Sequence, residues 1–260
     1  MLFVLRMLLM GVHFVVAGAM GLVLGICRPF NPDNSRLCAR LYALPAMWIL
    51  RLRLRLHADT GAPFDRTRPC VIVCNHQSNY DLFILGNIVP PRTVCIGKKS
   101  LKWVPFFGQL FWLAGNVLID RGNPLRARLS IRQTTETLQH KDTSIWVFPE
   151  GTRNKGRGLL PFKRGAFQMA IDAGVPIVPV CVSTYVRDMQ LNAWDSGRVM
   201  IRALPAIATT GLTSDDIPQL IERCHGQMQA AIEQMDTQLR APSTAAQTVA
   251  ERPAQNTRTR

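Results

Sequence analysis

Short apolar runs alternate along this chain with longer segments in which polar and apolar residues mix. The runs that predict buried strands cover residues 70–74, 93–96, 117–119, 145–148, 177–182 and 199–203. The segments with helical spacing lie near 79–88, 101–114, 124–140, 164–173 and 215–239. Short buried strands separated by helices are typical of an α/β fold, so we predict a mixed, largely parallel sheet flanked by helices.

Residues 51–56 follow a different pattern, because arginine and leucine alternate at every position. Strict period-two alternation predicts an edge strand with one apolar face and one cationic face. The three arginines could meet anionic lipid headgroups or could simply be solvated, and the sequence leaves both interpretations open.

The first 27 residues are almost entirely apolar and are interrupted only by Arg6 and His13. The run over 7–27 approaches the ~20 residues that cross a bilayer. A cleaved signal peptide is the alternative, since small residues occupy 17–19. Against it, a single charge precedes the apolar run, and the run continues to Ile26. We therefore expect a retained membrane segment.

Basic residues follow this apolar segment. They are Arg28, Arg36, Arg40, Arg51, Arg53 and Arg55. If the first helix spans the membrane, positive charge after it places the body of the chain in the cytoplasm. A second apolar stretch, 41–50, is too short to span but suits the membrane interface. Two helices that dip into one leaflet fit the sequence equally well.

These patterns divide the chain into three parts. Residues 1–50 form an N-terminal membrane-anchoring helical segment, and residues 51–240 form the α/β domain. Residues 241–260 are mainly Ala, Thr, Gln, Pro and Arg without periodicity, which predicts a disordered polar tail.

Composition narrows the choice of partner. The chain has 260 residues, enough for a full core, and its formal net charge is +14. A basic surface indicates an anionic partner, either nucleic acid, anionic lipid or a phosphorylated substrate. No zinc finger, recognition-helix pattern or aromatic-basic RNA motif occurs in the sequence, so we expect no nucleic acid. The seven cysteines are scattered and lack metal-ligand spacing, so we predict no metal.

A histidine and a carboxylate stand five residues apart after the run 70–74, at His76 and Asp81. The two side chains can meet if His76 precedes a helix and Asp81 lies in the first turn of that helix. Ser78 or Asn79 would then be the N-cap of the helix. Asp81 would then accept a hydrogen bond from one ring nitrogen and leave the other nitrogen as a base. A histidine that only satisfies a backbone carbonyl is the structural alternative.

A second motif, Phe148–Arg153, follows the run 145–148. Arg153 stands on a glycine-containing turn and could grip a phosphate with two N–H donors. Glu150 suits a substrate hydroxyl, or it could hold Arg153 in place. A surface ion pair on a turn is the alternative without function.

Two further cations, Lys98 and Arg121, come directly after predicted strands. Ligands of α/β proteins gather at the carboxyl ends of strands. Together with Arg153 these residues would make a convergent anion site, although each alone is more often a solvated charge. The aromatic segment 103–112 suits core packing, with contact to an acyl chain or a membrane as the second interpretation.

Four ordered blocks of this sequence resemble the motifs of the glycerolipid acyltransferase family. They are Asn75–Asp81, Gly115–Arg121, Phe148–Arg153 and Val175–Pro179. Residues 97–121 and 156–163 resemble the bacterial 1-acyl-sn-glycerol-3-phosphate (lysophosphatidic acid) acyltransferases in particular. The likeness covers roughly residues 28–240. Asn154 departs from the serine that many relatives carry.

This resemblance implies an enzyme of the bacterial inner membrane whose catalytic domain faces the cytoplasm. It would move a fatty acyl group from acyl carrier protein or coenzyme A to the sn-2 hydroxyl of lysophosphatidic acid, giving phosphatidic acid without a cofactor. It also implies that His76 is the general base and Asp81 its orienter. Backbone amides or Lys98 are the candidate oxyanion donors, and the residues implied for the acceptor site are Arg121, Glu150, Gly151, Thr152 and Arg153.

Other functions stay open at this point. The acceptor could be glycerol 3-phosphate or another lysolipid, since the motifs report chemistry more than acceptor. A non-catalytic protein that binds anionic lipid would share the same charge. A serine hydrolase is disfavoured, because Ser183 lacks the flanking glycines of a nucleophile elbow.

Overall fold

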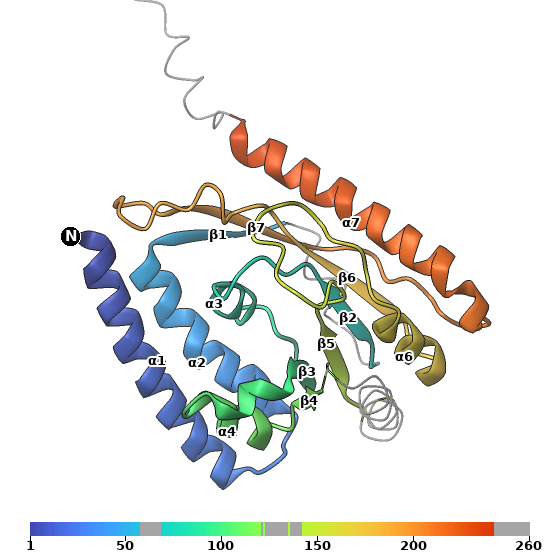
Figure 1. The fold of residues 1–260 in the computed structure, drawn as a ribbon, viewed down its shortest axis with the longest axis horizontal. Helices are drawn as coiled ribbons and strands as arrows, with labels where there is room; N and C mark the ends of the chain where they lie inside the picture. The colour runs from blue at the N-terminus through green and yellow to red at the C-terminus, as the bar shows by residue number, and fades with distance from the viewer. Residues whose placement is uncertain (58–68, 121, 123–134, 136–141, 242–260) are drawn as a thin grey trace, which may run out of the picture.

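A seven-stranded mixed sheet forms the centre of the molecule in the computed structural model, which describes residues 1–57, 69–120, 122, 135 and 142–241 (Figure 1). The strand order is β1-β7-β6-β2-β5-β3-β4. The strands are β1 (Leu52–Leu56), β2 (Val71–Cys74), β3 (Thr93–Lys98), β4 (Val117–Ile119), β5 (Ser144–Val147), β6 (Ile177–Val182) and β7 (Gly197–Ala203).

All neighbouring strands pair in parallel except β6 and β7, which are antiparallel. The predicted mixed, largely parallel sheet is therefore confirmed. The predicted edge strand is confirmed too, because β1 lies at the end of the sheet with Leu52 buried and both Arg53 and Arg55 exposed.

Helices cover both faces of the sheet. They are α1 (Leu2–Cys27), α2 (Asp33–Leu50), α3 (Asp81–Leu85), α4 (Phe107–Leu113), α6 (Gly165–Ala173) and α7 (Ile217–Arg240), with 3-10 turns at Lys99–Trp103 and Ser214–Asp216. Helices α1 to α4 lie on one side of the sheet, and α6 and α7 lie on the other (Figure 1).

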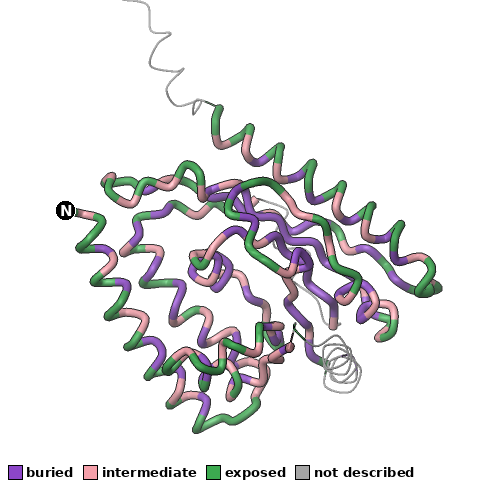
Figure 2. Tube along the Cα trace, viewed as in Figure 1, coloured by how far each residue is buried: buried purple, intermediate pink, exposed green. Residues whose placement is uncertain are grey.

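Strand β2 shows the reason why the predicted strands are unbroken apolar runs in the sequence. Val71 and Val73 belong to the hydrophobic cluster under α6 and α7, whereas Ile72 and Cys74 belong to the cluster under α1 to α3. All four side chains are fully buried, so the central strands form the most buried part of the molecule (Figure 2). A strand covered on both faces needs an apolar residue at every position.

Helix α1 packs through a stripe of small residues. Added side chains at Gly18, Gly21 and Gly25 would collide with Phe106, Leu110 and Leu113 in and just before α4. The opposite side of α1 is apolar and exposed, for example at Leu8, Val12 and Ile26. By length and composition α1 is the one helix among the described residues that could cross a membrane.

Helix boundaries differ from the predictions in two places. The segment 101–114 divides into a 3-10 turn and α4, because Pro105 lacks an N–H and Phe106 adopts a positive φ of 63°. The helix predicted near 79–88 is shorter and begins at Asp81. The helix predicted at 124–140 and the tail from 242 lie outside the described residues, apart from Thr135.

Candidate active site

Two loops meet at the carboxyl ends of the neighbouring parallel strands β2 and β5. The amide of Asn154 donates to the carbonyl of His76 at 2.8 Å, and the amide of Lys155 donates to the carbonyl of Gln77 at 3.1 Å. These backbone bonds join the two motifs into one unit, which fixes the side chains of each motif relative to the other.

His76 and Asp81 form a close pair within this unit. Nδ1 of His76 lies 2.6 Å from Oδ2 of Asp81, whose side chain is 2% exposed against 23% for His76. A carboxylate at Nδ1 assigns the proton to that nitrogen, so Nε2 carries a lone pair. Nε2 has no hydrogen-bond partner in the described part of the chain, and the ring stacks on Phe148 at 4.1 Å. The pair has the geometry of an oriented general base.

Asp81 is held by the turn that precedes α3. Its Oδ2 also accepts the amides of Gln77 at 2.6 Å and Ser78 at 3.0 Å. The prediction that Ser78 or Asn79 caps the helix is wrong. Tyr80 is the N-cap and makes no side-chain capping bond, because the Asp81 carboxylate itself turns back to take the preceding amide donors.

Glu150 is buried behind the histidine. Its Oε1 accepts the amide of His76 at 2.6 Å, and its Oε2 accepts the amide of Leu160 at 3.0 Å and the side-chain amide of Asn154 at 3.2 Å. Burial raises the pKa of Glu150, and these hydrogen bonds act in the opposite direction. Donors from the protein therefore occupy both oxygens of this carboxylate.

Arg153 does not pair with Glu150 in the described structure. Its guanidinium is exposed and donates to the side-chain oxygen of Asn79, from the first motif. Thr152 is also exposed. Gly151 has a φ of +68°, and a side chain there would meet Lys163 at 2.7 Å, so the turn requires glycine. The turn thus presents a cation next to Asn79 of the first motif.

The end of strand β6 supplies contacts that the sequence reasoning missed. The side chain of Asn75 donates to the carbonyl of Val182 at 2.9 Å and accepts its amide at 2.8 Å. The hydroxyl of Tyr185 donates to Oδ1 of Asp81 at 2.6 Å. The one signal in the sequence was position, since Tyr185 follows a predicted strand that ends at the same edge of the sheet.

Comparison with known proteins places this chain in a family. The family model "Acyltransferase" matches residues 55–183. The 1-acyl-sn-glycerol-3-phosphate acyltransferase of Haemophilus influenzae is 39% identical over 240 residues, which are 92% of this chain and 98% of that protein. The chain belongs to the 1-acyl-sn-glycerol-3-phosphate acyltransferase family. The Escherichia coli K12 member is 38% identical, over 92% of this chain and 96% of its own.

More distant relatives agree with this assignment. The human 1-acyl-sn-glycerol-3-phosphate acyltransferase alpha is 37% identical over 221 residues, 83% of this chain and 77% of its own. The crystal structure of the 1-acyl-sn-glycerophosphate (LPA) acyltransferase of Thermotoga maritima superposes with a TM-score of 0.68. It is 20% identical and covers 93% of this chain and 100% of its own, which confirms the fold.

The other cations predicted for the site of this acyltransferase are only partly described. Lys98 is exposed at the end of β3, two strands away from β2. Its neighbour Lys99 pairs with Asp120 at 3.1 Å. Arg121 lies outside the described residues, so the expected convergence of Lys98, Arg121 and Arg153 stays a prediction.

Ser183 has a structural role in this acyltransferase. Its side chain is fully buried, and its hydroxyl accepts the amide of Met200 at 2.9 Å. This disagrees with the exposed nucleophile that a serine hydrolase requires, because a hydrolase nucleophile stands on an exposed turn.

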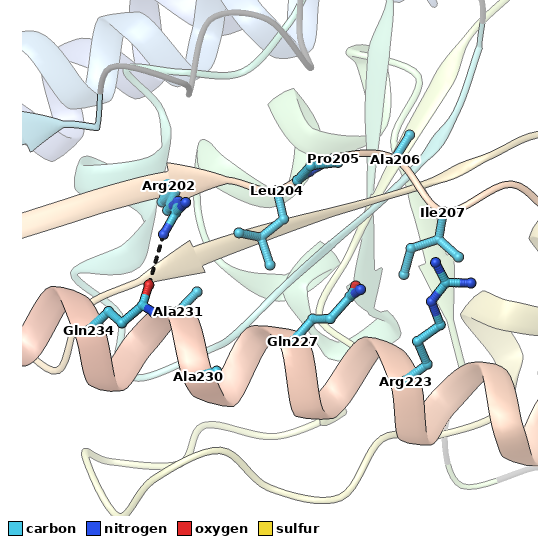
Figure 3. A pocket seen from close by; sticks show the side chains of 10 residues that line it. All are labelled: Arg202, Leu204, Pro205, Ala206, Ile207, Arg223, Gln227, Ala230, Ala231 and Gln234. Atoms are coloured by element: carbon cyan, nitrogen blue, oxygen red, sulfur yellow. Dashed lines mark hydrogen bonds between the residues drawn. The ribbon is translucent and has the colours of Figure 1, made fainter.

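A groove of about 320 Å³ lies between α7 and the end of β7, on the α7 face of the sheet (Figure 3). Arg202, Leu204 and Ile207 line it from β7 and the segment that follows, and Arg223 and Gln227 line it from α7. None of the residues that line it belongs to the two motif loops. No group of three or more His, Cys, Asp or Glu that could hold a metal occurs among the described residues.

Proposed function

We propose that this acyltransferase moves a fatty acyl group from a thioester of coenzyme A or acyl carrier protein to the sn-2 hydroxyl of 1-acyl-sn-glycerol 3-phosphate. The product is phosphatidic acid. The names of its relatives support the acceptor and the reaction. The 2.6 Å contact between His76 and Asp81 is the observation that carries the chemistry.

In the proposed reaction, Nε2 of His76 takes the proton of the sn-2 hydroxyl while the oxygen attacks the thioester carbonyl carbon. The tetrahedral intermediate then collapses and releases the thiolate, which takes the proton back from Nε2. Asp81 stabilises the protonated ring between these steps. The acyl group passes directly to the acceptor, so no acyl-enzyme forms. Because a thioester is already activated, base catalysis and positioning, each worth ~10² to 10⁴-fold, suffice without a cofactor.

We assign the acceptor phosphate to Arg153 and Arg121, with Gly151 and Thr152 shaping the turn beside it. The Arg153 guanidinium is exposed and makes one hydrogen bond within the described part of the chain, to Asn79, which supports this assignment because a guanidinium has further N–H donors for a phosphate. We assign Glu150 the task of fixing the His76 amide instead of holding the substrate hydroxyl, since protein donors fill both its oxygens. Lys98 is the candidate donor to the oxyanion.

We further propose that α1 lies along one leaflet and does not span the bilayer. Both ends of the helix are tied to the α/β domain. Near its N-terminus, the buried guanidinium of Arg6 donates to the carbonyls of Leu191, Ala193 and Trp194 at 2.7 to 2.9 Å. Near its C-terminus, Gly25 packs against Leu113 of α4.

These ties place the domain alongside the helix, and Figure 1 shows α1 running beside α2 over its length. A spanning helix would instead carry the domain at one end, with lipid on all its sides. The exposed apolar side of α1 therefore faces the lipid. We place the basic α/β domain on the cytoplasmic side of the inner membrane, as the family resemblance implies.

Acyl transfer by the purified protein tests the proposal. One labelled long-chain acyl-CoA is offered to 1-acyl-sn-glycerol 3-phosphate and, in a second tube, to glycerol 3-phosphate, with His76→Ala in parallel. Labelled phosphatidic acid from the first acceptor only, lost in His76→Ala, supports acceptor and base together. Product from glycerol 3-phosphate alone overturns the acceptor. If neither tube gives product, acyl carrier protein replaces coenzyme A, and failure there too favours a non-catalytic lipid-binding protein.

A further inference from the structure

The hydroxyl of Tyr185 reaches the orienting carboxylate from the neighbouring strand. We propose that Tyr185 is a positioning residue, which fixes the Asp81 carboxylate and, through it, the His76 ring. This inference rests on the proposed function, because it gives Tyr185 a part in the same base catalysis.

The two oxygens of Asp81 have different partners. Oδ2 faces Nδ1 of His76 and two backbone amides, whereas Oδ1 accepts from the Tyr185 hydroxyl at 2.6 Å. Tyr185 is the donor to Oδ1 among the described residues. A buried carboxylate oxygen without a donor is costly, so without this hydroxyl the carboxylate would tilt or recruit water. Either change moves Oδ2 relative to the histidine ring.

The position of Tyr185 is itself defined by the fold. Its side chain is 1% exposed, and its amide donates to the side chain of Gln77 at 3.3 Å. The preceding amide, of Thr184, donates to Asp236 of α7 at 2.7 Å. Ser78 Oγ lies 2.8 Å from the Tyr185 hydroxyl and completes its hydrogen bonding. Both Gln77 and Ser78 belong to the loop that carries His76.

The Tyr185 hydroxyl also keeps its proton. Burial raises its pKa, and the negative charge of Asp81 raises it further. A hydroxyl that stays protonated is a donor at every pH at which a membrane enzyme works. It can therefore hold an ionised carboxylate without competing for the proton that His76 must move.

Removal of the hydroxyl alone tests the proposal, since Tyr185→Phe keeps the ring and its packing. We expect kcat to fall on the order of tenfold while both Michaelis constants stay within about twofold, because the hydrogen bond acts on the base and not on either substrate. In an Asp81→Ala background, Tyr185→Phe should change kcat by less than about twofold, because its effect passes through Asp81.

The matched control is Tyr80→Phe, which removes a hydroxyl in the same loop. Among the described residues that hydroxyl hydrogen-bonds to the sulfur of Met7, at 4.0 Å, and not to Asp81, so kcat should be preserved. Equal losses in Tyr80→Phe and Tyr185→Phe would attribute the effect to general loosening and overturn the proposal. So would a loss confined to the Michaelis constants, or an unchanged kcat in Tyr185→Phe.

A further readout separates positioning from folding, because it reports directly on the hydrogen bond between His76 and Asp81. The low-field proton resonance of the Nδ1–H bond, observed in protein labelled with ¹⁵N-histidine, should shift in Tyr185→Phe and not in Tyr80→Phe. An unmoved resonance overturns the inference. Because this resonance needs no turnover, it tests the inference even if the proposed reaction fails.

Discussion

At the scale of single residues, one buried carboxylate organises the site. Asp81 accepts hydrogen bonds from the His76 ring, the Gln77 and Ser78 amides and the Tyr185 hydroxyl. A carboxylate that is this fully bonded cannot rotate freely, and this is how it holds the imidazole in one orientation.

The dyad predicts a specific pattern of losses. His76→Ala should abolish acyl transfer and Asp81→Ala should nearly abolish it, because the proposed base and its orienter would act as a unit. The double variant should be little slower than His76→Ala alone. Steady-state kinetics with labelled acyl-CoA measure this, and losses that add in free energy would contradict the dyad.

Replacement of Arg153 should change substrate binding more than turnover. Arg153→Ala should chiefly raise the Michaelis constant for the phosphorylated acceptor, by about tenfold or more, because the proposed guanidinium–phosphate pair would form on binding. Arg223→Ala, which removes an exposed arginine from α7, is the control and should leave that constant unchanged. An unchanged constant in Arg153→Ala would remove Arg153 from the phosphate.

Replacement of Lys155 should make the protein more stable. It is exposed and holds a φ of 56°, which costs most side chains energy but is tolerated by asparagine. Lys155→Asn should raise the free energy of unfolding by about 0.5 to 1 kcal/mol. Lys155→Ala removes the same charge without relieving the backbone, so a similar gain there in thermal unfolding would contradict the explanation.

Residue types and spacing predicted His76 and Asp81 as a pair, and the structure brings the two side chains together. The direction of Glu150 was not predictable. Its carboxylate bonds the His76 amide, 74 positions away in the chain, and spacing along a turn gives no information about such a partner.

At the scale of elements, α1 combines two different sides. One side carries the glycines that let α4 approach closely, and the other exposes large apolar side chains. A soluble protein rarely leaves so large an apolar surface in water. These two sides fit the proposed arrangement, in which one side of α1 packs on the protein and the other faces lipid.

Charges on the lipid side of α1 test this arrangement. The double substitution Leu8→Lys and Val12→Lys should weaken cosedimentation with phospholipid vesicles at least about tenfold, since buried charge is costly in hydrocarbon. Both side chains are more than half exposed, so the fold should be kept. The control variant carries Gln229→Lys and Glu233→Lys on α7 instead. Both positions are also exposed, and this variant should not weaken binding. Equal weakening from both sites would contradict the assignment.

Periodicity predicted most elements and their order, because both faces of the central strands are buried and α7 is amphipathic. It did not predict the division of 101–114, where Phe106 adopts a positive φ and its Cβ packs closely against Gly18 of α1. Such local conformations depend on contacts between elements, and these contacts cannot be predicted from a local sequence pattern.

At the scale of the whole molecule, the sheet separates two environments. One face of the sheet is covered by α1 to α4, and the outer side of α1 is apolar and exposed. The other face is covered by α6 and α7. The site lies at the edge where β2, β5 and β6 end. Under the proposed function, the lipid acceptor would reach this edge from the membrane and the thioester donor would reach it from the cytoplasm.

From the net charge of +14 we predict how membrane binding depends on lipid charge and on salt. Vesicle binding should strengthen when anionic lipid is added and weaken with rising salt, because exposed charges are screened within about 10 Å at 0.1 M salt. Binding should not vanish at high salt, because the α1 contact is apolar. Complete release by salt, measured by flotation, would show that charge alone attaches the protein.

The sequence by itself determined the class of fold, the order of the strands and helices, and the placement of both motifs at strand ends, because hydrophobic periodicity and short motifs are local properties. Only the tertiary structure decided that the two motif loops share backbone hydrogen bonds, that Glu150 points inward and that Tyr185 reaches Asp81. Tyr185 and Asp81 are 104 positions apart. Such contacts depend on which strands lie side by side and on where each side chain points, and these are settled only when the whole sheet packs.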